Sequence, residues 1–162
     1  MATMKTKYDL FIILNQLNVD YRNYQHPAIY TTEDAKKIAI DIPGIHCKNL
    51  FLQDTKENVY LLVANAEKNV NLKSLSKIIN SSRLSFVSAE LLYQILGVLP
   101  GSVSPLALIN DVEQKATVLL DKNIIGSSCV NFHPLDNTMT TAITADNLLK
   151  FINYCGNKII VV

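Results

Sequence analysis

The sequence predicts a single α/β (α+β) domain built around a mixed, mainly antiparallel central sheet or a partial barrel flanked by helices. A chain of 162 residues has the length of one domain, and 49% hydrophobic against 18% charged residues is typical of a chain that folds. Segments of strand type and of helix type alternate irregularly, without a repeated β-α-β period. No linker, internal repeat or low-complexity segment divides the chain, so we expect residues 1–162 to form one domain.

The N-terminal part predicts two helices joined by an extended stretch. In front of each helix a threonine is followed three positions later by an aspartate, which is a capping-box pattern. The expected elements are a helix over 7–18, an extended stretch over 19–26 and a helix over about 32–39. Pro43 and Gly44 end the second helix, because proline disfavours helix before it and glycine permits a turn.

The middle of the chain predicts a hairpin and then two helices around a short strand. Two apolar runs over 48–54 and 58–65 are separated by polar residues, so we expect a hairpin of two central strands. Asn71 and Ser88 stand where a helix N-cap is expected, and Gly97 stands where the second helix should end. The remaining expected elements are a helix over 72–80, a strand over 84–87 and a helix over 89–96.

The C-terminal part predicts strands followed by one helix. Apolar runs punctuated by turn residues indicate strands over 105–109, 116–121, 128–133 and 138–144. The periodicity then changes to that of a helix over 146–155, which Gly156 ends, and 158–162 could add an edge strand.

Composition excludes several classes of function. The formal net charge of +1 gives no global electrostatic reason to bind nucleic acid, so any RNA contact must be local and no DNA partner is expected. The three cysteines are widely spaced and the three histidines lie in separate segments, so we expect no disulfide framework and no metal. Nucleophile-elbow, zinc-protease, Walker and dinucleotide-binding motifs are absent from the sequence. No apolar stretch is long enough to span a bilayer, and we expect a soluble cytoplasmic protein.

Two adjacent polar residues lie in an apolar strand. Lys48 and Asn49 open the run KNLFLQD, and strand alternation places one of them on the buried face if the other points outward. A buried polar side chain requires a partner. The pattern leaves two interpretations open: Lys48 and Asn49 contact a ligand, or they are a solvated strand-end lysine and a turn former.

A stiff loop precedes the second half of the chain. In LPGSVSP, Pro100 and Gly101 suit the second and third positions of a type II turn, and Pro105 restrains the residue before it to extended geometry. The backbone N–H groups of Gly101, Ser102 and Val103 have no evident partner within the chain, so they could bind a carbonyl oxygen or a phosphate. A rigid turn without a ligand is the alternative.

A histidine stands at the end of an apolar strand, in the stretch NFHPLDNTMTT. His133 is followed by Pro134, and Asp136, Asn137 and several hydroxyl groups come after it. Such a histidine is either a satisfied structural residue or part of a site. Cys47 and Cys129 lie in apolar runs and are expected to be core cysteines rather than reactive thiols.

Taken together, these stretches resemble the YbaK/ProX family of free-standing aminoacyl-tRNA deacylases, and most closely its PrdX or ProXp-ala branch. The similarity extends over about residues 24–151, and its most specific parts are GVLPGSVSPLALIND and NFHPLDNTMTT. The resemblance implies an editing-domain fold and hydrolysis of alanine mis-esterified to tRNA(Pro), without a cofactor. The expected partners are the acceptor end of tRNA(Pro) and prolyl-tRNA synthetase.

The resemblance also implies roles for individual residues. Lys48 matches the family's essential lysine and Asn49 a position implicated in activity, while His133 matches a pocket histidine near the amino-acid moiety. The stretch from Gly101 to Pro105 matches a GxxxP loop that positions the ester, with Ser102 and Val103 inside it. Asn137 could add a hydrogen bond to the substrate. No side-chain nucleophile and no metal are implied.

Two other functions stay open at this point. One is the same reaction on Cys-tRNA(Pro), the target of the sister branch. The other is a binding module without catalysis, in which an editing fold is kept for docking to tRNA or to the synthetase. In the second case Lys48 would be replaceable without loss of function.

Overall fold

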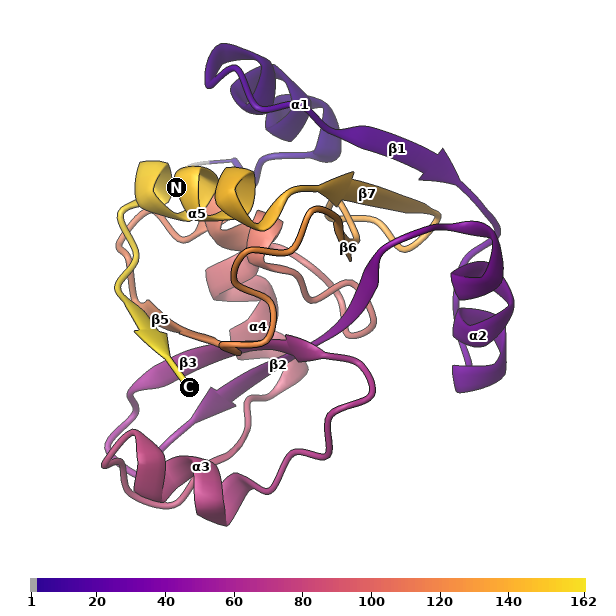
Figure 1. The fold of residues 1–162 in the computed structure, drawn as a ribbon. Helices are drawn as coiled ribbons and strands as arrows, with labels where there is room; N and C mark the ends of the chain where they lie inside the picture. Colours follow the sequence, from indigo (N-terminus) through magenta and orange to yellow (C-terminus); the bar gives the residue numbers. More distant parts are fainter. Residues whose placement is uncertain (1–2) are drawn as a thin grey trace.

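The computed structural model describes residues 3–162, which form an eight-stranded mixed sheet with helices around it (Figure 1). The α-helices are α1 (Lys7–Gln16), α2 (Thr32–Asp41), α3 (Leu72–Ile78), α4 (Ala89–Leu96) and α5 (Ala145–Cys155), and η1 (Pro105–Asn110) is a 3₁₀-helix. The strands are β1 (Arg22–Gln25), β2 (Ile45–Gln53), β3 (Val59–Asn65), β4 (Ser85–Phe86), β5 (Ala116–Leu120), β6 (Val130–Phe132), β7 (Met139–Ile143) and β8 (Ile159–Val161).

The sheet has the order β1-β7-β6-β2-β3-β5-β8, with β4 paired to β2. Pairing is antiparallel for β1–β7, β6–β7, β2–β3 and β2–β4, and parallel for β2–β6, β3–β5 and β5–β8. The predicted mixed α/β fold is therefore confirmed. So are the central hairpin, which is β2 and β3, and the closing edge strand, which is β8.

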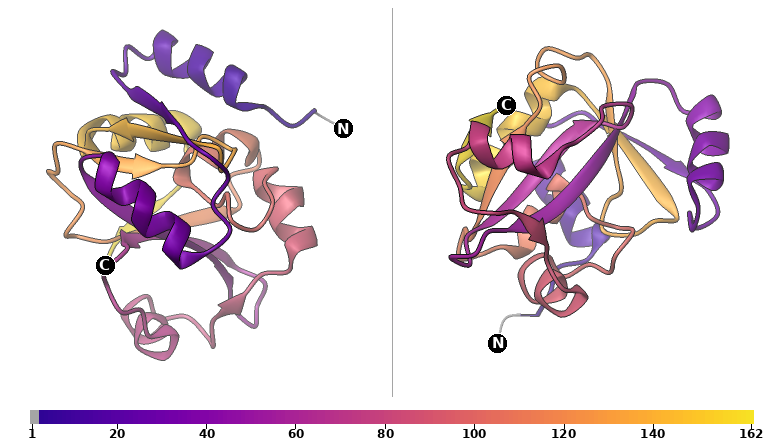
Figure 2. Two further views of the ribbon diagram at one scale, coloured as in Figure 1. Left: turned by 90° about the vertical axis from the view of Figure 1, so that its right-hand side faces the viewer. Right: turned by 90° about the horizontal axis from the view of Figure 1, so that it is seen from below.

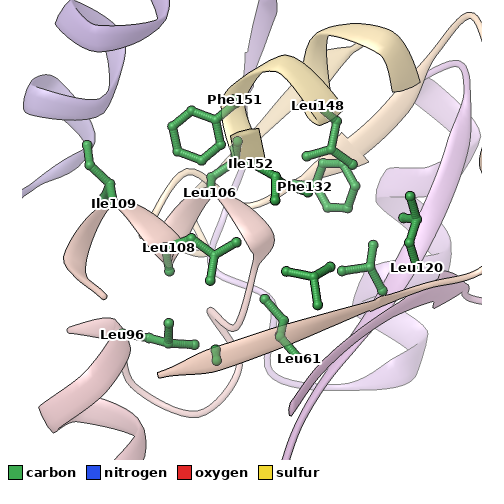
Figure 3. Close-up of a cluster of buried hydrophobic side chains, with 14 of the residues drawn as sticks. Leu61, Leu96, Leu106, Leu108, Ile109, Leu120, Phe132, Leu148, Phe151 and Ile152 are labelled. Carbon is green, nitrogen blue, oxygen red and sulfur yellow. The ribbon is translucent and has the colours of Figure 1, made fainter. Parts of the chain in front are cut away.

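The two faces of the sheet bury different clusters, because successive side chains of a strand point to opposite faces. Phe51 and Leu61 belong to the larger cluster, which α4, η1 and α5 cover. Figure 3 shows side chains from these three elements, among them Leu96, Leu106 and Phe151, converging on β3 and β5. Leu52 and Leu62 belong to the smaller cluster, which packs against α3. In Figure 1 α3 and α5 lie on opposite sides of β2 and β3.

Local capping signals fix where several helices begin. The Asp34 N–H donates to Thr31 Oγ1 at 3.0 Å, and the Ser74 N–H donates to Asn71 Oδ1 at 3.0 Å. The Leu91 N–H donates in the same way to the Ser88 hydroxyl at 3.1 Å. These caps are confirmed because each needs only residues three positions apart.

The prediction of a strand over 105–109 is wrong, because this segment is the first part of the 3₁₀-helix η1. All six residues of η1 are buried, so the segment is apolar on every side and its sequence carries no helical stripe. The Ser104 hydroxyl accepts the Leu106 N–H at 3.1 Å, and Pro105 occupies the first turn, where its missing N–H costs no hydrogen bond. Both features start a helical turn.

Helix α2 lies at the periphery of the molecule, and the chain leaves it at both ends toward strands (Figures 1 and 2). Its inward side chains Ala35, Ile38 and Ala39 are half-buried, while Ile40 is exposed. The helix therefore covers the sheet loosely, and its inner side faces the cavity described below. In the part of the chain that is described, no helix has the length and apolar character needed to cross a membrane.

Candidate active site

A cavity of about 570 Å³ lies between the inner side of α2 and the strands β2, β6 and β7. This volume is within the range of small-molecule sites. The wall opposite α2 is formed by the N-terminal half of β2, the end of β6 and the turn after β3. Its polar lining residues are Lys36, His46, Cys47, Asn49, Asn65, Glu67, Asn131, His133 and Thr140.

Asn49 points into this cavity from the middle of β2. Its neighbours on the same strand face, Cys47 and Phe51, pack against the larger cluster, so alternation places Asn49 on that face too. The Asn49 Oδ1 atom is buried and has no hydrogen-bond partner among residues 3–162. Because a buried unpaired oxygen is costly, Asn49 is the polar group of the site that most requires a ligand.

His133 enters the cavity from the end of β6 with a defined tautomer. Its Nδ1 lies 2.9 Å from the Met139 carbonyl oxygen, which can only accept, so Nδ1 carries the proton. Burial lowers the pKa of His133 below its ordinary value; the Met139 carbonyl opposes the shift, and His26 adds to it. At neutral pH the ring is uncharged, and Nε2, which has no partner among residues 3–162, can accept a hydrogen bond.

A second histidine supports the same wall. His26 Nδ1 lies 2.9 Å from the Pro27 carbonyl, so its Nε2 accepts from the Thr140 hydroxyl at 2.8 Å when the ring is neutral. The His26 and His133 rings meet edge to face, with centroids 6.0 Å apart. The Asn137 Nδ2–H donates to the carbonyl of Ile29 at 3.0 Å, and Ile29 lines the cavity. Asn137 thus acts on the cavity through the segment before α2.

Lys48 faces the opposite side of the sheet from Asn49. Its strand neighbours Leu50 and Leu52 belong to the cluster that packs on α3. The half-buried Lys48 ammonium donates a hydrogen bond to the Lys68 carbonyl, just beyond the turn whose residues line the cavity. Lys48 is not itself a lining residue. The structure therefore brings Asn49 and His133 together and leaves Lys48 next to the cavity wall.

The loop 101–105 is not part of the cavity lining either. Its turn has the predicted geometry, because Gly101 has a φ of +95° and the Ser102 N–H donates to the Leu99 carbonyl at 3.1 Å. That bond corrects one expectation: the Ser102 N–H has an intrachain partner and is not free for a ligand. Within residues 3–162, the N–H groups of Gly101 and Val103 are assigned no acceptor.

The described residues contain no group of three or more histidine, cysteine and carboxylate side chains that could hold a metal ion. That the reaction needs no metal and no cofactor stays a prediction.

Comparison with known proteins identifies the family. A model of the aminoacyl-tRNA editing domain matches residues 26–151. The chain belongs to the aminoacyl-tRNA editing domain family. The "Prolyl-tRNA editing protein ProX" of Acetoanaerobium sticklandii is 37% identical over 155 residues, which cover 95% of this chain and 94% of that protein. The resemblance to the YbaK/ProX family is thereby confirmed.

Further relatives of the editing domain agree with this assignment. The "Prolyl-tRNA synthetase associated domain-containing protein 1" of Danio rerio is 31% identical over 154 residues, covering 94% of this chain and 84% of that protein. A solved structure of a candidate trans-editing enzyme for prolyl-tRNA synthetase superposes with a TM-score of 0.71 at 16% identity, covering 98% of each chain. At that identity, the superposition shows the fold alone.

Two cysteines of the editing domain, Cys47 and Cys155, are not activated nucleophiles. Burial raises the pKa of the Cys47 thiol to about 12, and the charge of Asp121 contributes in the same direction. Because the thiolate is the reactive form, the Cys47 side chain is inert at neutral pH although it lines the cavity. Burial likewise raises the pKa of the Cys155 thiol to about 12.

Sequence reasoning missed several residues of the cavity. His46, Asn131 and Thr140 were given no role, although Asn131 and Thr140 belong to the stretch NFHPLDNTMTT, and they reach the cavity because β2, β6 and β7 are neighbours in the sheet. The small residues of α2 gave a weak signal. Ala35 and Ala39 stand four positions apart, which puts both on one face of a helix, and that face lines the cavity.

Proposed function

We propose that this editing domain is a trans-editing hydrolase that deacylates mischarged Ala-tRNA(Pro) and releases alanine and free tRNA. The observation that carries the proposal is the position of Asn49 and His133 in one cavity, with the Asn49 oxygen buried and unpaired. The relative named as a prolyl-tRNA editing protein supports the choice of tRNA(Pro). The alanine preference rests on the resemblance of the loop and of NFHPLDNTMTT to the PrdX or ProXp-ala branch.

Water is the nucleophile in this proposal. The only lining residue with a nucleophilic sulfur is Cys47, whose thiol has a pKa of about 12 and is held protonated. An aminoacyl ester is already activated, and the vicinal hydroxyl of the terminal ribose can help to orient water. A site that positions water and stabilises the developing oxyanion is therefore sufficient. The reaction needs neither a metal nor a cofactor.

The uncharged His133 gives the cavity a hydrogen-bond acceptor. With Nδ1–H donated to the Met139 carbonyl, Nε2 can accept from the attacking water or from the aminoacyl group. Asn49 supplies a second polar contact, directed from β2. These two residues hold the aminoacyl end in our proposal, while Asn137 keeps Ile29 in the wall.

Lys48 and the loop act on the part of the substrate outside the cavity. The Lys48 ammonium is directed toward the turn at the cavity wall, where it can pair with the phosphate next to the terminal adenosine. The loop from Gly101 to Pro105 offers the N–H groups of Gly101 and Val103 to the ester or a phosphate. Gly101 is exposed, and this allows a ligand to approach its backbone closely.

A separate editing site has a physical rationale. A synthetic site shaped for proline gains only about 1–3 kcal/mol per methylene over a smaller amino acid, so a second and smaller site is needed to remove alanine. The protein meets its substrate in the cytoplasm in this proposal, either alone or docked on prolyl-tRNA synthetase.

One assay tests the proposal. Ala-tRNA(Pro), Cys-tRNA(Pro) and Pro-tRNA(Pro) are incubated with the protein and with Lys48→Ala, and loss of the ester is followed after subtracting spontaneous hydrolysis. We expect fast loss of the alanyl ester only, and a large reduction in Lys48→Ala. Loss of the cysteinyl ester alone would show that the substrate is Cys-tRNA(Pro) and that the assignment of Ala-tRNA(Pro) is wrong. If no ester is cleared faster than in buffer, the proposed hydrolase function is wrong.

A further inference from the structure

Lys48 and a buried carboxylate lie on the same face of the sheet, on either side of Ala64. Lys48 pairs with Ala64 in the β2–β3 register, and Val63 pairs with Leu120 in the β3–β5 register. Asp121 follows Leu120 directly, and its N–H donates to the Val63 carbonyl at 2.9 Å, so it continues the ladder next to Ala64. Two strand spacings separate Lys48 from Asp121, about 10 Å between backbones.

Strand alternation shows that both charged side chains leave the sheet on the α3 side. Leu119, two residues before Asp121, belongs to the cluster that packs on α3, as do Leu50 and Leu52 beside Lys48. Ala64 between them has only a methyl group, so the space between the ammonium and the carboxylate is not filled from the sheet.

Lys68 occupies that space and contacts both groups. Its carbonyl accepts from the Lys48 ammonium, and its own ammonium lies 3.2 Å from Asp121 Oδ1. The Asp121 side chain is fully buried, whereas Lys68 is 39% exposed. The Asn65 N–H at 3.2 Å and the Asn123 N–H at 3.0 Å also donate to the carboxylate. Asp121 therefore holds the turn from Asn65 to Lys68, whose first residues line the cavity.

Asp121 is an anion that needs a cation. Burial acts to raise its pKa, but the N–H groups of Asn123 and Asn65 and the Lys68 ammonium outweigh burial, and the pKa lies below its ordinary value. If a buried carboxylate loses its cationic partner, it attracts another cationic side chain that can reach it. The Lys48 side chain leaves the same face of the sheet, across Ala64 from Asp121, and it carries such a cation.

Lys48, in contrast, has no carboxylate within ion-pair distance in the described part of the chain. Among the described residues, its ammonium donates to the neutral carbonyl of Lys68. The positive charge is therefore not compensated, and further N–H groups of the ammonium can donate to a ligand. We propose that Lys68 is a positioning residue that neutralises Asp121 and so keeps the Lys48 ammonium free for an anionic group of the substrate. This inference rests on the proposed function, because it assigns how Lys48 is kept available for the phosphate of the acceptor end.

The variant Lys68→Met tests the idea, because it removes the ammonium and keeps both the backbone carbonyl and an unbranched side chain as long as the lysine stem up to Cε. Without Lys68 the Asp121 carboxylate draws the Lys48 ammonium across Ala64 and away from the substrate. We expect KM for Ala-tRNA(Pro) to rise about tenfold, the usual effect of losing one charge-assisted contact, with kcat nearly unchanged. The slope of log(kcat/KM) against log salt should become less steep by about 0.7–0.9, the value for one phosphate contact.

Three further variants and one matched control separate this role from a structural one. In Lys68→Met/Asp121→Asn there is no carboxylate to capture Lys48, so KM and the salt slope should return to near the wild-type values. In a Lys48→Met background, Lys68→Met should change KM no further. Lys68→Arg should keep the wild-type KM. The matched control is Lys115→Met, which breaks the exposed pair with Glu113 at 3.0 Å and should leave KM unchanged.

The outcomes are decisive in both directions. The proposal is wrong, and Lys68 is only structural, if Lys68→Met raises KM equally in the wild-type and in the Lys48→Met background. The same holds if adding Asp121→Asn to Lys68→Met restores the melting temperature but not KM. If the wild type clears no ester, the proposed function fails, and the same variants are compared in equilibrium binding to an acceptor-stem minihelix of tRNA(Pro). In these binding measurements, the slope of log Kd against log salt for Lys68→Met must equal the slope for Lys48→Met. A wild type that binds no minihelix, or a different slope, overturns the inference.

Discussion

The unpaired oxygen of Asn49 leads to an expectation that is unusual for a buried residue: its removal should stabilise the protein and impair its activity. In Asn49→Leu the side chain keeps nearly the same size, but the oxygen that lacks a partner is gone. Leaving a buried acceptor unpaired costs about 1–3 kcal/mol, so we expect a gain in the free energy of unfolding of about 1–2 kcal/mol. For a chain of this size, the melting temperature rises by about 2–8 °C.

The control for Asn49→Leu is the same substitution at a satisfied asparagine. Asn131 lies on the neighbouring strand β6 and also lines the cavity, but its Nδ2–H donates to the Pro43 carbonyl at 2.9 Å. Asn131→Leu loses this bond, so it should lower stability by about 1 kcal/mol, or the melting temperature by about 2–4 °C. The two variants are compared by thermal unfolding under identical conditions.

Activity is measured on the same samples, as the rate of ester loss from Ala-tRNA(Pro). We expect Asn49→Leu to reduce this rate by about tenfold or more, because a polar contact to the substrate is worth about 1.5 kcal/mol when charge is involved. A melting temperature that falls as much as in Asn131→Leu would show that Asn49 Oδ1 is hydrogen-bonded in the folded protein. A full rate of ester loss would remove Asn49 from the substrate site.

Three other predictions follow from the site. Gly101→Val places a side chain on a residue with a φ of +95°, which costs about 1–3 kcal/mol of folding free energy, and it should abolish deacylation. The control is Gly126→Val, at a residue with a φ of +82° and equally open surroundings. It should lower the melting temperature by a similar amount and leave turnover unchanged. Because the pKa of His133 is lowered, kcat/KM should fall on the acid side with a midpoint below pH 6.5, and His133→Gln should lack this limb; an unchanged limb would exclude His133 as its source. The ion pair with Lys7 at 2.8 Å is the main cause that lowers the pKa of Asp136 to about 2, so its stabilisation is present above the unfolded-state pKa of 3.8 and is lost as the pH falls through about 2. Allowing for solvent screening, this is about 1–2 kcal/mol, and a pH titration of unfolding should show it missing in Asp136→Asn.

Sequence reasoning identified the features that depend on near neighbours. The caps at Thr31, Asn71 and Ser88 were correct, because each is a bond between a side chain and a backbone N–H three positions away. The type II turn at Gly101 was correct for the same reason. Alternation along β2 also predicted that Lys48 and Asn49 leave on opposite faces, since this depends on the backbone of one strand only.

Contacts between distant segments could not be read in this way. The segment 105–109 is apolar on all sides, so its pattern does not distinguish a buried strand from a buried 3₁₀ turn, and the surroundings of α4 and α5 decided it. The error at Ser102 is of another kind, because the bond from its N–H to the Leu99 carbonyl is local and could have been inferred from the predicted type II turn. Lys68 carried no signal at all, because its role depends on Asp121, more than fifty residues away.

The sequence by itself thus determined which segments are helices and strands, with the exception of 105–109, where most helices begin, and which family the chain resembles. Only the tertiary structure decided which polar groups share a cavity and which charges are already paired. The physical reason is that caps, turns and alternation are interactions within a few residues. Burial, pairing of charges and the shape of a cavity arise when strands far apart in the chain become neighbours in one sheet.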